Sequence, residues 1–404
     1  MNTRWVWGSV VLGAALGIGW WMAEPSEPRM EPARSTAAVN PAHATEPRVD
    51  GAVGASPTAQ VPYSAAGLQA RQEQLALWRG RLERAEQLYA SYRDSTRYPF
   101  ESRPISEHPD QVRPFAPIEE ELVLRGAQGE PLAGLRLRTS QERVFASGAD
   151  SIKFTVEAVD DRGRSLPLSI RQASAQSVAD SRTPVRIIQA PVPFADEGGL
   201  TDDVAGDNRF SARLTPATQG FASYNGTIRV LAEIAANGQQ GVAQFDVVYA
   251  PEVPATWLGV REALEHGSLN FYLKANVRKG GRYVVSARVD DAQGRPFALL
   301  QYNDEVAPGP REFRLQVFGA LVLDRNPTFP LQLRDVEGFL LIPDTFPDRA
   351  LMPRQNGVVH ASQRYARDRF SSAEWTSEER ERYLAEYAKD AEEAKRKLQE
   401  MQGR

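Results

Sequence analysis

The sequence predicts a mainly β protein with two tandem antiparallel β-sandwiches, framed by helices at both ends. Three observations lead to this prediction. Short runs of alternating apolar and polar residues recur between turn signals at intervals of about 8–12 residues, as in sandwiches and barrels. An uncharged apolar run stands near the N-terminus, and two longer stretches carry apolar residues at helical spacing.

Composition limits the function classes. A chain of 404 residues corresponds to two or three domains at about 150 residues each. A hydrophobic content of 42% with 25% charged residues excludes wholesale disorder. The net charge of -4 gives no support to a nucleic-acid partner. Because cysteine is absent, disulfides, thiolate metal sites and cysteine nucleophiles are excluded.

Residues 1–23 are predicted to be a transmembrane signal-anchor. Residues 5–23 carry no charge and, as a helix with a rise of about 1.5 Å per residue, span roughly the hydrocarbon core of a bilayer. Arg4 precedes this run, and Glu24 follows it, which places the N-terminus in the cytoplasm and the bulk of the chain outside. A cleaved signal peptide is the alternative, but Trp21 fits poorly at the −3 position before Glu24. We therefore expect an uncleaved single-pass anchor, with the bulk of the chain on the outer side of the membrane.

Residues 24–66 are a Pro/Ala-rich disordered linker, and residues 67–95 are an amphipathic helix. The apolar stripe of this helix recurs at heptad-like spacing: Leu68, Leu75, Trp78, Leu82, Ala85, Tyr89 and Tyr92. Two interpretations of residues 67–92 stay open. The stripe docks on the following domain, or it forms the seam of a parallel homodimer.

Residues 96–118 contain five prolines, which lack the amide donor needed for a strand ladder and favour extended backbone. We expect an extended strap that Tyr98, Phe100 and Phe115 anchor.

Residues 119–250 are the predicted first sandwich. Residues 151–160, 227–235 and 242–249 alternate between apolar and polar side chains. Asn225-Gly226 and Asn237-Gly238 lie beside these runs, and Asn-Gly is a strong hairpin signal because a type I′ turn needs positive φ at two positions.

Residues 251–345 are the predicted second sandwich. The run YVVSARVDDAQGRPFAL from Tyr283 is similar to KFTVEAVDDRGRSLPL from Lys153. Each has a strand, an Asp-Asp pair, a glycine turn with an arginine, and another strand. This internal repeat favours two related sandwiches over one large barrel.

Residues 346–375 are an extended tail, and residues 376–404 are a charged helix. Thr376 and Glu379 have the spacing of a capping box at its start. Many charged residues surround the apolar positions of this helix, so we expect it to be solvated. The alternative is a helix that docks on the rest of the chain or binds a partner.

No catalytic constellation is evident, and the chain is predicted not to be an enzyme. The GxSxG, HExxH, P-loop and GxGxxG motifs are absent. The four histidines are scattered along the sequence: His43, His108, His266 and His360. A hydrolase with two carboxylates ranks last among the functions considered.

An acidic loop, residues 195–210, is the candidate metal site. Between Asp196 and Asp207 it holds five carboxylates and no basic side chain. Ca²⁺ prefers six to eight oxygen ligands, and Asp196, Asp202 and Asp207 supply carboxylates if the loop folds back. The alternative is an acidic turn in which the aspartates cap backbone amides.

The same run, DEGGLTDDVAGDNRF, resembles the signature of bacterial Ig-like extracytoplasmic domains of the choice-of-anchor X type. The matching positions are Asp196, Gly198, Asp202, Gly206, Asp207 and Phe210. Asn208 stands where that pattern often has glycine, and asparagine tolerates left-handed backbone. The resemblance implies tandem Ig-like β-sandwiches outside a bacterial membrane, and it implies no enzymatic activity.

The resulting functional hypothesis is a binding or scaffold protein of the cell envelope. Exposed sheet edges and loops would contact an unidentified envelope protein. The alternative is a glycan- or peptidoglycan-binding module, for which Trp257, Tyr302 and Phe313 are the candidate aromatic platforms.

Overall fold

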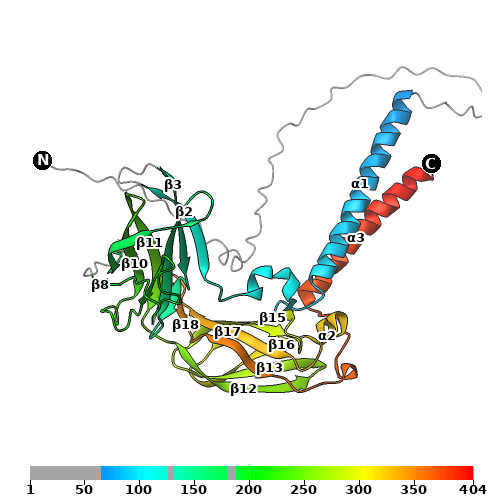
Figure 1. The fold of residues 1–404 in the computed structure, drawn as a ribbon. Coiled ribbons are helices and arrows are strands. Elements are labelled where there is room, and N and C mark those ends of the chain that lie inside the picture. The colour runs from blue at the N-terminus through cyan, green and yellow to red at the C-terminus, as the bar shows by residue number, and fades with distance from the viewer. Residues whose placement is uncertain (1–64, 126–130, 180–187, 200, 404) are drawn as a thin grey trace, which may run out of the picture. The chain divides into compact units, whose positions relative to one another are not determined.

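A computed structural model describes residues 65–125, 131–179, 188–199 and 201–403. The predicted anchor at residues 5–23 lies outside these residues. Within them the protein is mainly β, with four sheets and three α-helices (Figure 1). None of the described helices is long and apolar enough to cross a membrane.

The first sheet pair comprises two sheets that share one hydrophobic core. One sheet has the order β2-β3-β5-β6, with β9 also paired to β5, and the other has the order β4-β11-β10-β7-β8. The strands are β2 (Ile118–Arg125), β3 (Pro131–Gln141), β4 (Phe145–Ser147), β5 (Ile152–Val159), β6 (Ser165–Leu166), β7 (Leu168–Ser177), β8 (Gln189–Pro191), β9 (Arg209–Leu214), β10 (Gly226–Ala236) and β11 (Gln239–Ala250).

The alternation in the sequence accounts for this core. Successive side chains of a strand point to opposite faces, so one face of β10 is buried along its length. Phe154 of β5 meets Phe245 of β11 across the two sheets, with ring centroids 4.8 Å apart. The three strands predicted at residues 151–160, 227–235 and 242–249 are confirmed as β5, β10 and β11.

The second sheet pair encloses its own core. One sheet has the order β1-β15-β14-β17-β18, with β19 also on β17, and the other has the order β12-β13-β16. The elements are β1 (Ser102–Pro104), β12 (Ala255–Glu265), β13 (Ser268–Val277), β14 (Gly281–Asp290), β15 (Pro296–Val306), β16 (Gly309–Val317), α2 (Gly319–Arg325), β17 (Gln332–Leu341), β18 (Arg349–Leu351) and β19 (Gln355–Ala361). The last two strands come from the region expected to be an extended tail.

The internal repeat corresponds to a repeated turn. Asp160, after β5, accepts hydrogen bonds from the backbone amides two and four residues further on, both at 2.9 Å. Asp291, after β14, does the same at 2.9 and 3.0 Å. Gly163 and Gly294 hold the left-handed position, with φ of 72° and 75°. The two repeats differ after this turn. In the second repeat, β15 pairs with β14 in the same sheet, whereas in the first repeat β7 belongs to the opposite sheet from β5.

One of the two predicted Asn-Gly hairpins exists. Asn237 and Gly238 have φ of 49° and 76° and join β10 to β11. The prediction for Asn225-Gly226 is wrong, since Gly226 is the first residue of β10 rather than part of a hairpin turn. A Cβ at Gly226 would lie 2.9 Å from the Tyr224 hydroxyl, so close packing explains that glycine.

The strap, residues 96–117, joins the second sheet pair although it precedes the first one in sequence. Its strand β1 pairs with β15, and buried Tyr98 donates its hydroxyl hydrogen to Asp324 at 2.8 Å. Arg354 stacks over the ring of Phe115 at 4.6 Å. Phe100, also expected as an anchor, is 43% exposed. The first sheet pair is therefore an insertion between two parts of the chain that pack together.

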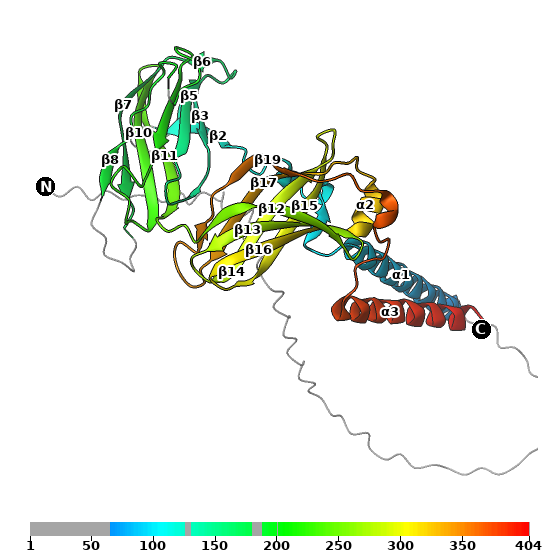
Figure 2. The same cartoon turned by 90° about the horizontal axis from the view of Figure 1, so that it is seen from below.

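Helices α1 (Ala65–Ser95) and α3 (Glu378–Gln402) lie side by side in both views (Figures 1 and 2). The Tyr92 ring packs edge-on against Tyr383 and Tyr387, with centroids 5.7 and 5.3 Å away. At the other end, Arg71 donates to the Met401 carbonyl at 2.7 Å. The helices therefore run antiparallel.

This pairing corrects two sequence interpretations. Docking on the following sandwich was one of the two interpretations of the stripe of residues 67–92, but the helix that carries it packs on the last helix of the chain. The charged helix was expected to be solvated, yet Ala394 and Arg380 on it are buried. A homodimer seam through the same stripe would have to displace α3.

The start of α3 also differs by one residue from the predicted capping box. Ser377 is the N-cap, and its hydroxyl accepts the Arg380 amide at 3.1 Å. Thr376 instead donates its hydroxyl to Glu381. The hydroxyl of either Thr376 or Ser377 could cap the helix, so the position of the backbone determines which of the two does so.

Candidate functional site

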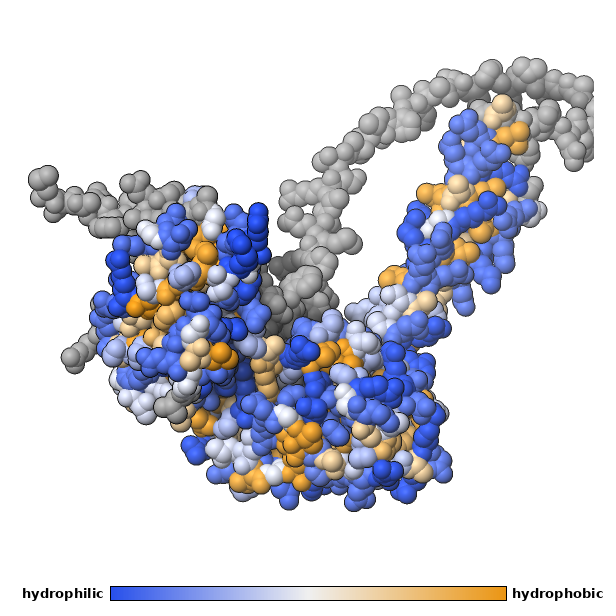
Figure 3. Space-filling view, in the orientation of Figure 1, coloured by the Kyte–Doolittle hydropathy of each residue, from blue (hydrophilic) through white to orange (hydrophobic). Residues whose placement is uncertain are grey.

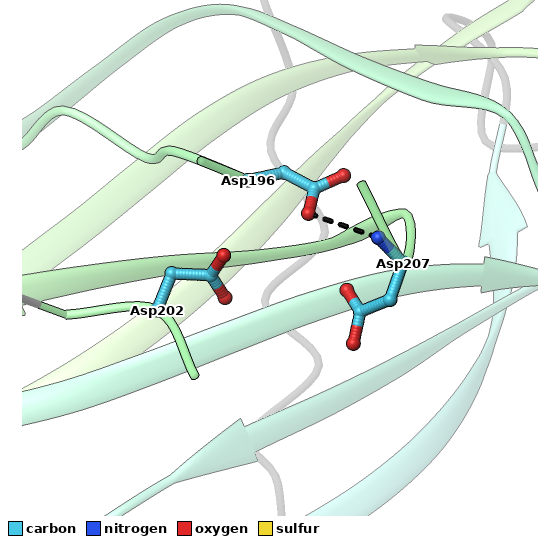
Figure 4. Close-up of side chains that lie close together, drawn as sticks. All are labelled: Asp196, Asp202 and Asp207. Carbon is cyan, nitrogen blue, oxygen red and sulfur yellow. Dashed lines mark hydrogen bonds between the residues drawn. The ribbon is translucent and has the colours of Figure 1, made fainter. Parts of the chain in front are cut away.

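The loop between β8 and β9 brings the three predicted metal ligands together (Figure 4). One carboxylate oxygen from each of Asp196, Asp202 and Asp207 lies within 4.8 Å of the other two. Asp202 is buried, Asp196 is half-buried and Asp207 is exposed. The loop folds back on itself, as the metal hypothesis required.

Backbone amides explain how the loop folds back. The Asp196 carboxylate accepts the amides of Gly206, Asp207 and Asn208 at 2.9, 3.2 and 3.0 Å. Gly206 and Asn208 have φ of 72° and 63°, so the left-handed backbone expected at Asn208 is confirmed. Asp196 thus closes the loop by itself.

The other two carboxylates also serve the loop. Asp202 accepts the Gly198 amide at 2.9 Å and the Ser211 hydroxyl at 3.3 Å. Asp207 accepts the Arg209 amide at 2.9 Å. A Cβ at Gly198 would lie 2.9 Å from the Ala205 nitrogen, which explains the glycine there. The turn interpretation is therefore satisfied as well.

One basic group reaches the loop from elsewhere in the sequence. Lys153 of β5 places its Nζ 2.9 Å from Asp203, and this hydrogen-bonded ammonium holds the pKa of the Asp203 carboxyl below its usual value. Sequence reasoning considered only the loop and missed Lys153. The lysine pairs with Asp203, so the triad of Asp196, Asp202 and Asp207 keeps its negative charge.

The donor set suits a hard cation. Ca²⁺ binds carboxylate, carbonyl and water oxygens in flexible geometry, whereas Mg²⁺ demands a near-ideal octahedron. Three converging carboxylates would supply part of a Ca²⁺ shell, and carbonyls or water would complete it. The amides that already bind Asp196 and Asp202 offset some of the negative charge of these carboxylates.

The aromatic residues considered for glycan binding have different environments. Phe313 is fully buried, and Trp257 packs edge-on against it with centroids 5.7 Å apart. The Trp257 indole also donates to the Pro353 carbonyl at 2.7 Å. Tyr302 is half-buried and lines a small surface cavity. Of these three, Tyr302 therefore lies in a recess at the surface.

An edge strand of the first sheet pair exposes apolar side chains beside charged ones. Strand β2 is outermost in its sheet, and Ile118, Leu122 and Val123 on it are 39%, 37% and 50% exposed. Within the described residues, β3 is its one ladder partner. Glu119 and Glu120 form no ion pair in that same part of the chain, whereas Glu121 pairs with Arg136 at 3.0 Å.

A buried carboxylate binds the end of β19 and the segment that follows it. The Glu262 carboxylate of β12 accepts the Tyr365 hydroxyl at 2.9 Å and the Gln363 amide at 2.8 Å, and it lies 3.0 Å from His360 Nε2. Burial, followed by this hydrogen bond, raises the pKa of Tyr365 to about 12. Glu262 lies about 100 positions before the three residues that contact it, so no pattern within a short stretch of sequence could have predicted the cluster.

Comparisons with known proteins give distant likenesses. No family model matches the chain, and no curated protein matches it. A solved DUF4785 family protein from Legionella pneumophila is similar at 13% identity and a TM-score of 0.36 over 56% of this chain and 57% of that one. The chain thus spans little more than half of that structure.

Two further structures are similar over parts of the chain. The Escherichia coli adhesin FdeC has 18% identity and a TM-score of 0.19, covering 43% of this chain and 59% of its own. Latent PorU from Porphyromonas gingivalis has 10% identity and a TM-score of 0.17, covering 61% of this chain and 20% of its own. At such TM-scores none of the three assigns a fold family or a function.

Proposed function

We propose that this chain is a non-enzymatic binding or scaffold protein of the bacterial cell envelope. Residues 5–23 hold it in the inner membrane, and its two sheet pairs act in the periplasm as Ig-like β-sandwiches. The partner is an envelope protein that binds through main-chain pairing at β2. The exposed apolar edge of β2 is the observation that carries this proposal.

An unpaired strand edge offers a row of amide and carbonyl groups to another chain. Natural proteins usually shorten, charge or cover such edges, because they otherwise promote association. Strand β2 is eight residues long and exposes Leu122 and Val123 near its end. An extended segment of a partner would complete the ladder and cover these side chains.

The charges of β2 indicate what such a segment contains. Glu119 and Glu120 precede the exposed apolar residues in the strand. Opposite charges on facing strands stabilise pairing, and like charges oppose it. The partner segment is therefore extended, with lysine or arginine next to apolar residues.

Photo-crosslinking in cells tests this proposal. A photoreactive phenylalanine in place of Val123 should capture an envelope protein, and replacing Glu119 and Glu120 with lysine should abolish the capture. The same probe in place of Leu258, which is 64% exposed on β12, is the matched control. Equal capture at both positions, or capture that survives the charge reversal, would rule out strand pairing at β2.

A second proposal concerns the acidic loop. We propose that Asp196, Asp202 and Asp207 bind Ca²⁺, which the convergence of their carboxylates supports. The resemblance of this run to an extracytoplasmic Ig-like signature is consistent with a cation that rigidifies the loop.

A further inference from the structure

A surface cavity of about 160 Å³ lies where the strap leaves β15. Strand β1 pairs with residues 298–300 of β15, and the Gln301 amide then donates to the Glu101 carbonyl at 3.0 Å. Beyond that hydrogen bond, residues 302–304 of β15 line the cavity together with Phe100 of the strap and Arg314 of β16. The cavity thus depends on the strap, β15 and β16 together.

The lining combines aromatic rings with groups of both charges. Phe100 is 43% exposed at the rim, and Tyr302 is half-buried beside it. Glu101 and Asp304 contribute carboxylates, and Arg314 contributes a guanidinium. Within the described residues these three charged groups form no ion pair with one another or with other side chains. One oxygen of the Asp304 carboxylate accepts the Glu305 amide at 2.8 Å, so its other oxygen, the Glu101 carboxylate and the Arg314 guanidinium remain available to a ligand.

The cavity is too small for a whole free ligand. Small-molecule sites usually have about 300–1,000 Å³, whereas this one has room for roughly five water molecules. It suits one unit of a polymer whose remaining units stay outside. Affinity for one unit would be weak, roughly millimolar, and would rise when several units bind.

We infer that this cavity binds an N-acetylated sugar unit of a glycan. An acetamido group offers one N–H donor and one carbonyl acceptor, which match a carboxylate of Glu101 or Asp304 and the guanidinium of Arg314. The apolar face of a sugar ring packs on an exposed aromatic ring, and Phe100 supplies one. Hydroxyl groups both donate and accept, so they suit the neighbouring amides of Gln316 and Asn303.

Ligand-observed saturation-transfer NMR on the full chain in detergent tests this inference, because it detects weak binding to a large protein. Tri-N-acetylchitotriose is the probe, and cellotriose is the matched sugar with hydroxyls in place of the acetamido groups. We expect saturation transfer from the protein to the acetamido methyl protons of tri-N-acetylchitotriose and little transfer to cellotriose. The transfer should be lost in Arg314→Ala and Asp304→Ala, and both residues are exposed, so the fold should persist.

Arg278→Ala is the control, because Arg278 is an exposed arginine that does not line the cavity. It should keep the full signal, and all three variants should melt like the wild type. Equal transfer to both sugars would refute acetamido recognition. Absence of transfer, or transfer that persists in both cavity variants, would refute the site. Transfer to D-alanyl-D-alanine alone would assign the cavity to a peptide instead. Each outcome is independent of strand pairing at β2.

Discussion

Aspartate carboxylates organise the turns of this protein through the same local chemistry. Asp160, Asp291 and Asp196 each accept two or more backbone amides within their own loop. Such bonds satisfy amides that a strand ladder cannot reach. An acidic loop in this chain therefore has a structural use before any cation is considered, and a metal hypothesis needs a test that separates the two.

Calcium should stabilise the wild-type protein and Asp203→Ala, but not Asp207→Ala. A ligand that binds the folded state alone contributes about 2.7 kcal/mol at one hundred times its Kd, which corresponds to a rise in Tm of roughly 5 °C. Asp203 is the matched control, because it lies in the same loop but pairs with Lys153. Thermal melting with millimolar calcium, and again after chelation, measures the effect. A shift that Asp207→Ala retains would place the ion elsewhere, and no shift in any variant would leave the loop a turn alone.

Two tyrosines, buried Tyr283 and half-buried Tyr365, should make the protein sensitive to high pH. Burial raises the pKa of Tyr283 to about 12, and burial with the Glu262 hydrogen bond raises that of Tyr365 to about 12. Folding therefore favours the neutral phenol over the phenolate. This contribution to stability is complete below the pKa of tyrosine in the unfolded chain, which is near 10, and it is lost as the pH rises from about 10 to 12.

Urea unfolding at several pH values between 8 and 12 measures this loss. Tyr283→Phe should be less stable at pH 8 by about 1 kcal/mol, because it lacks the hydroxyl that donates to the Lys279 carbonyl at 2.6 Å. Its free energy of unfolding should then fall less steeply above pH 10 than that of the wild type. Equal slopes for the two proteins would contradict the assignment to Tyr283.

At the scale of elements, the helix pair shows how an amphipathic stripe finds its partner. The stripe of α1 is only partly buried against α3, since its first residue, Leu68, remains 48% exposed. Leu77 and Leu88 of α1, which lie outside the stripe, are 51% and 48% exposed. Figure 3 shows apolar surface along the two helices between hydrophilic patches. Polar contacts add to this packing, since buried Arg380 donates to Thr96 at 3.0 Å and to Glu374 at 2.7 Å. Each helix therefore depends on the other.

Deleting residues 376–404 should reduce the helix content of the protein by more than the helical residues that are deleted. Helix α3 has 25 residues and α1 has 31. Most helical stability in proteins comes from packing an amphipathic face, so α1 should fray without its partner. Circular dichroism at 222 nm of the full and truncated chains measures the loss. A decrease equal to the share of α3 alone would show that α1 is stable by itself or through another partner.

At the scale of the whole molecule, the end of the described chain packs beside its beginning. Residues 65–117 pack with residues 251–402, and the first sheet pair is inserted between them. The insertion also contacts the second sheet pair directly, where the Leu351 amide donates to the buried Ser147 hydroxyl at 2.9 Å. The start of α1 and the end of α3 consequently lie at the same end of the helix pair.

Reporter fusions should reveal one orientation for both ends of the folded part. Alkaline phosphatase fused after Ala66 or after Gly403 should be active, because residues 5–23 are proposed to cross the inner membrane with the N-terminus inside. A reporter that works only in the cytoplasm should be inactive at both positions. The opposite result would reverse the topology, and a mature protein that begins after residue 23 would show cleavage instead of anchoring.

Local features of this protein could be predicted from the sequence. Alternation located β5, β10 and β11, since period-two burial depends on neighbouring residues alone. Asn237-Gly238 specified its own hairpin turn, and the acidic loop closed through hydrogen bonds within twelve residues. The convergence of the triad was predictable for that reason.

Long-range pairing was decided only by the tertiary structure. An apolar stripe indicates that one face of a helix is buried, but it does not indicate which element covers that face. The contact between Arg71 and Met401, which are 330 positions apart, could therefore not be predicted from the residues around either of them. The same holds for the strap on β15 and for the cavity, whose lining comes from three distant segments. The physical reason is that the hydrophobic effect is non-directional. It requires that apolar surface be buried, and the shape and hydrogen bonding of the whole chain select which surfaces meet.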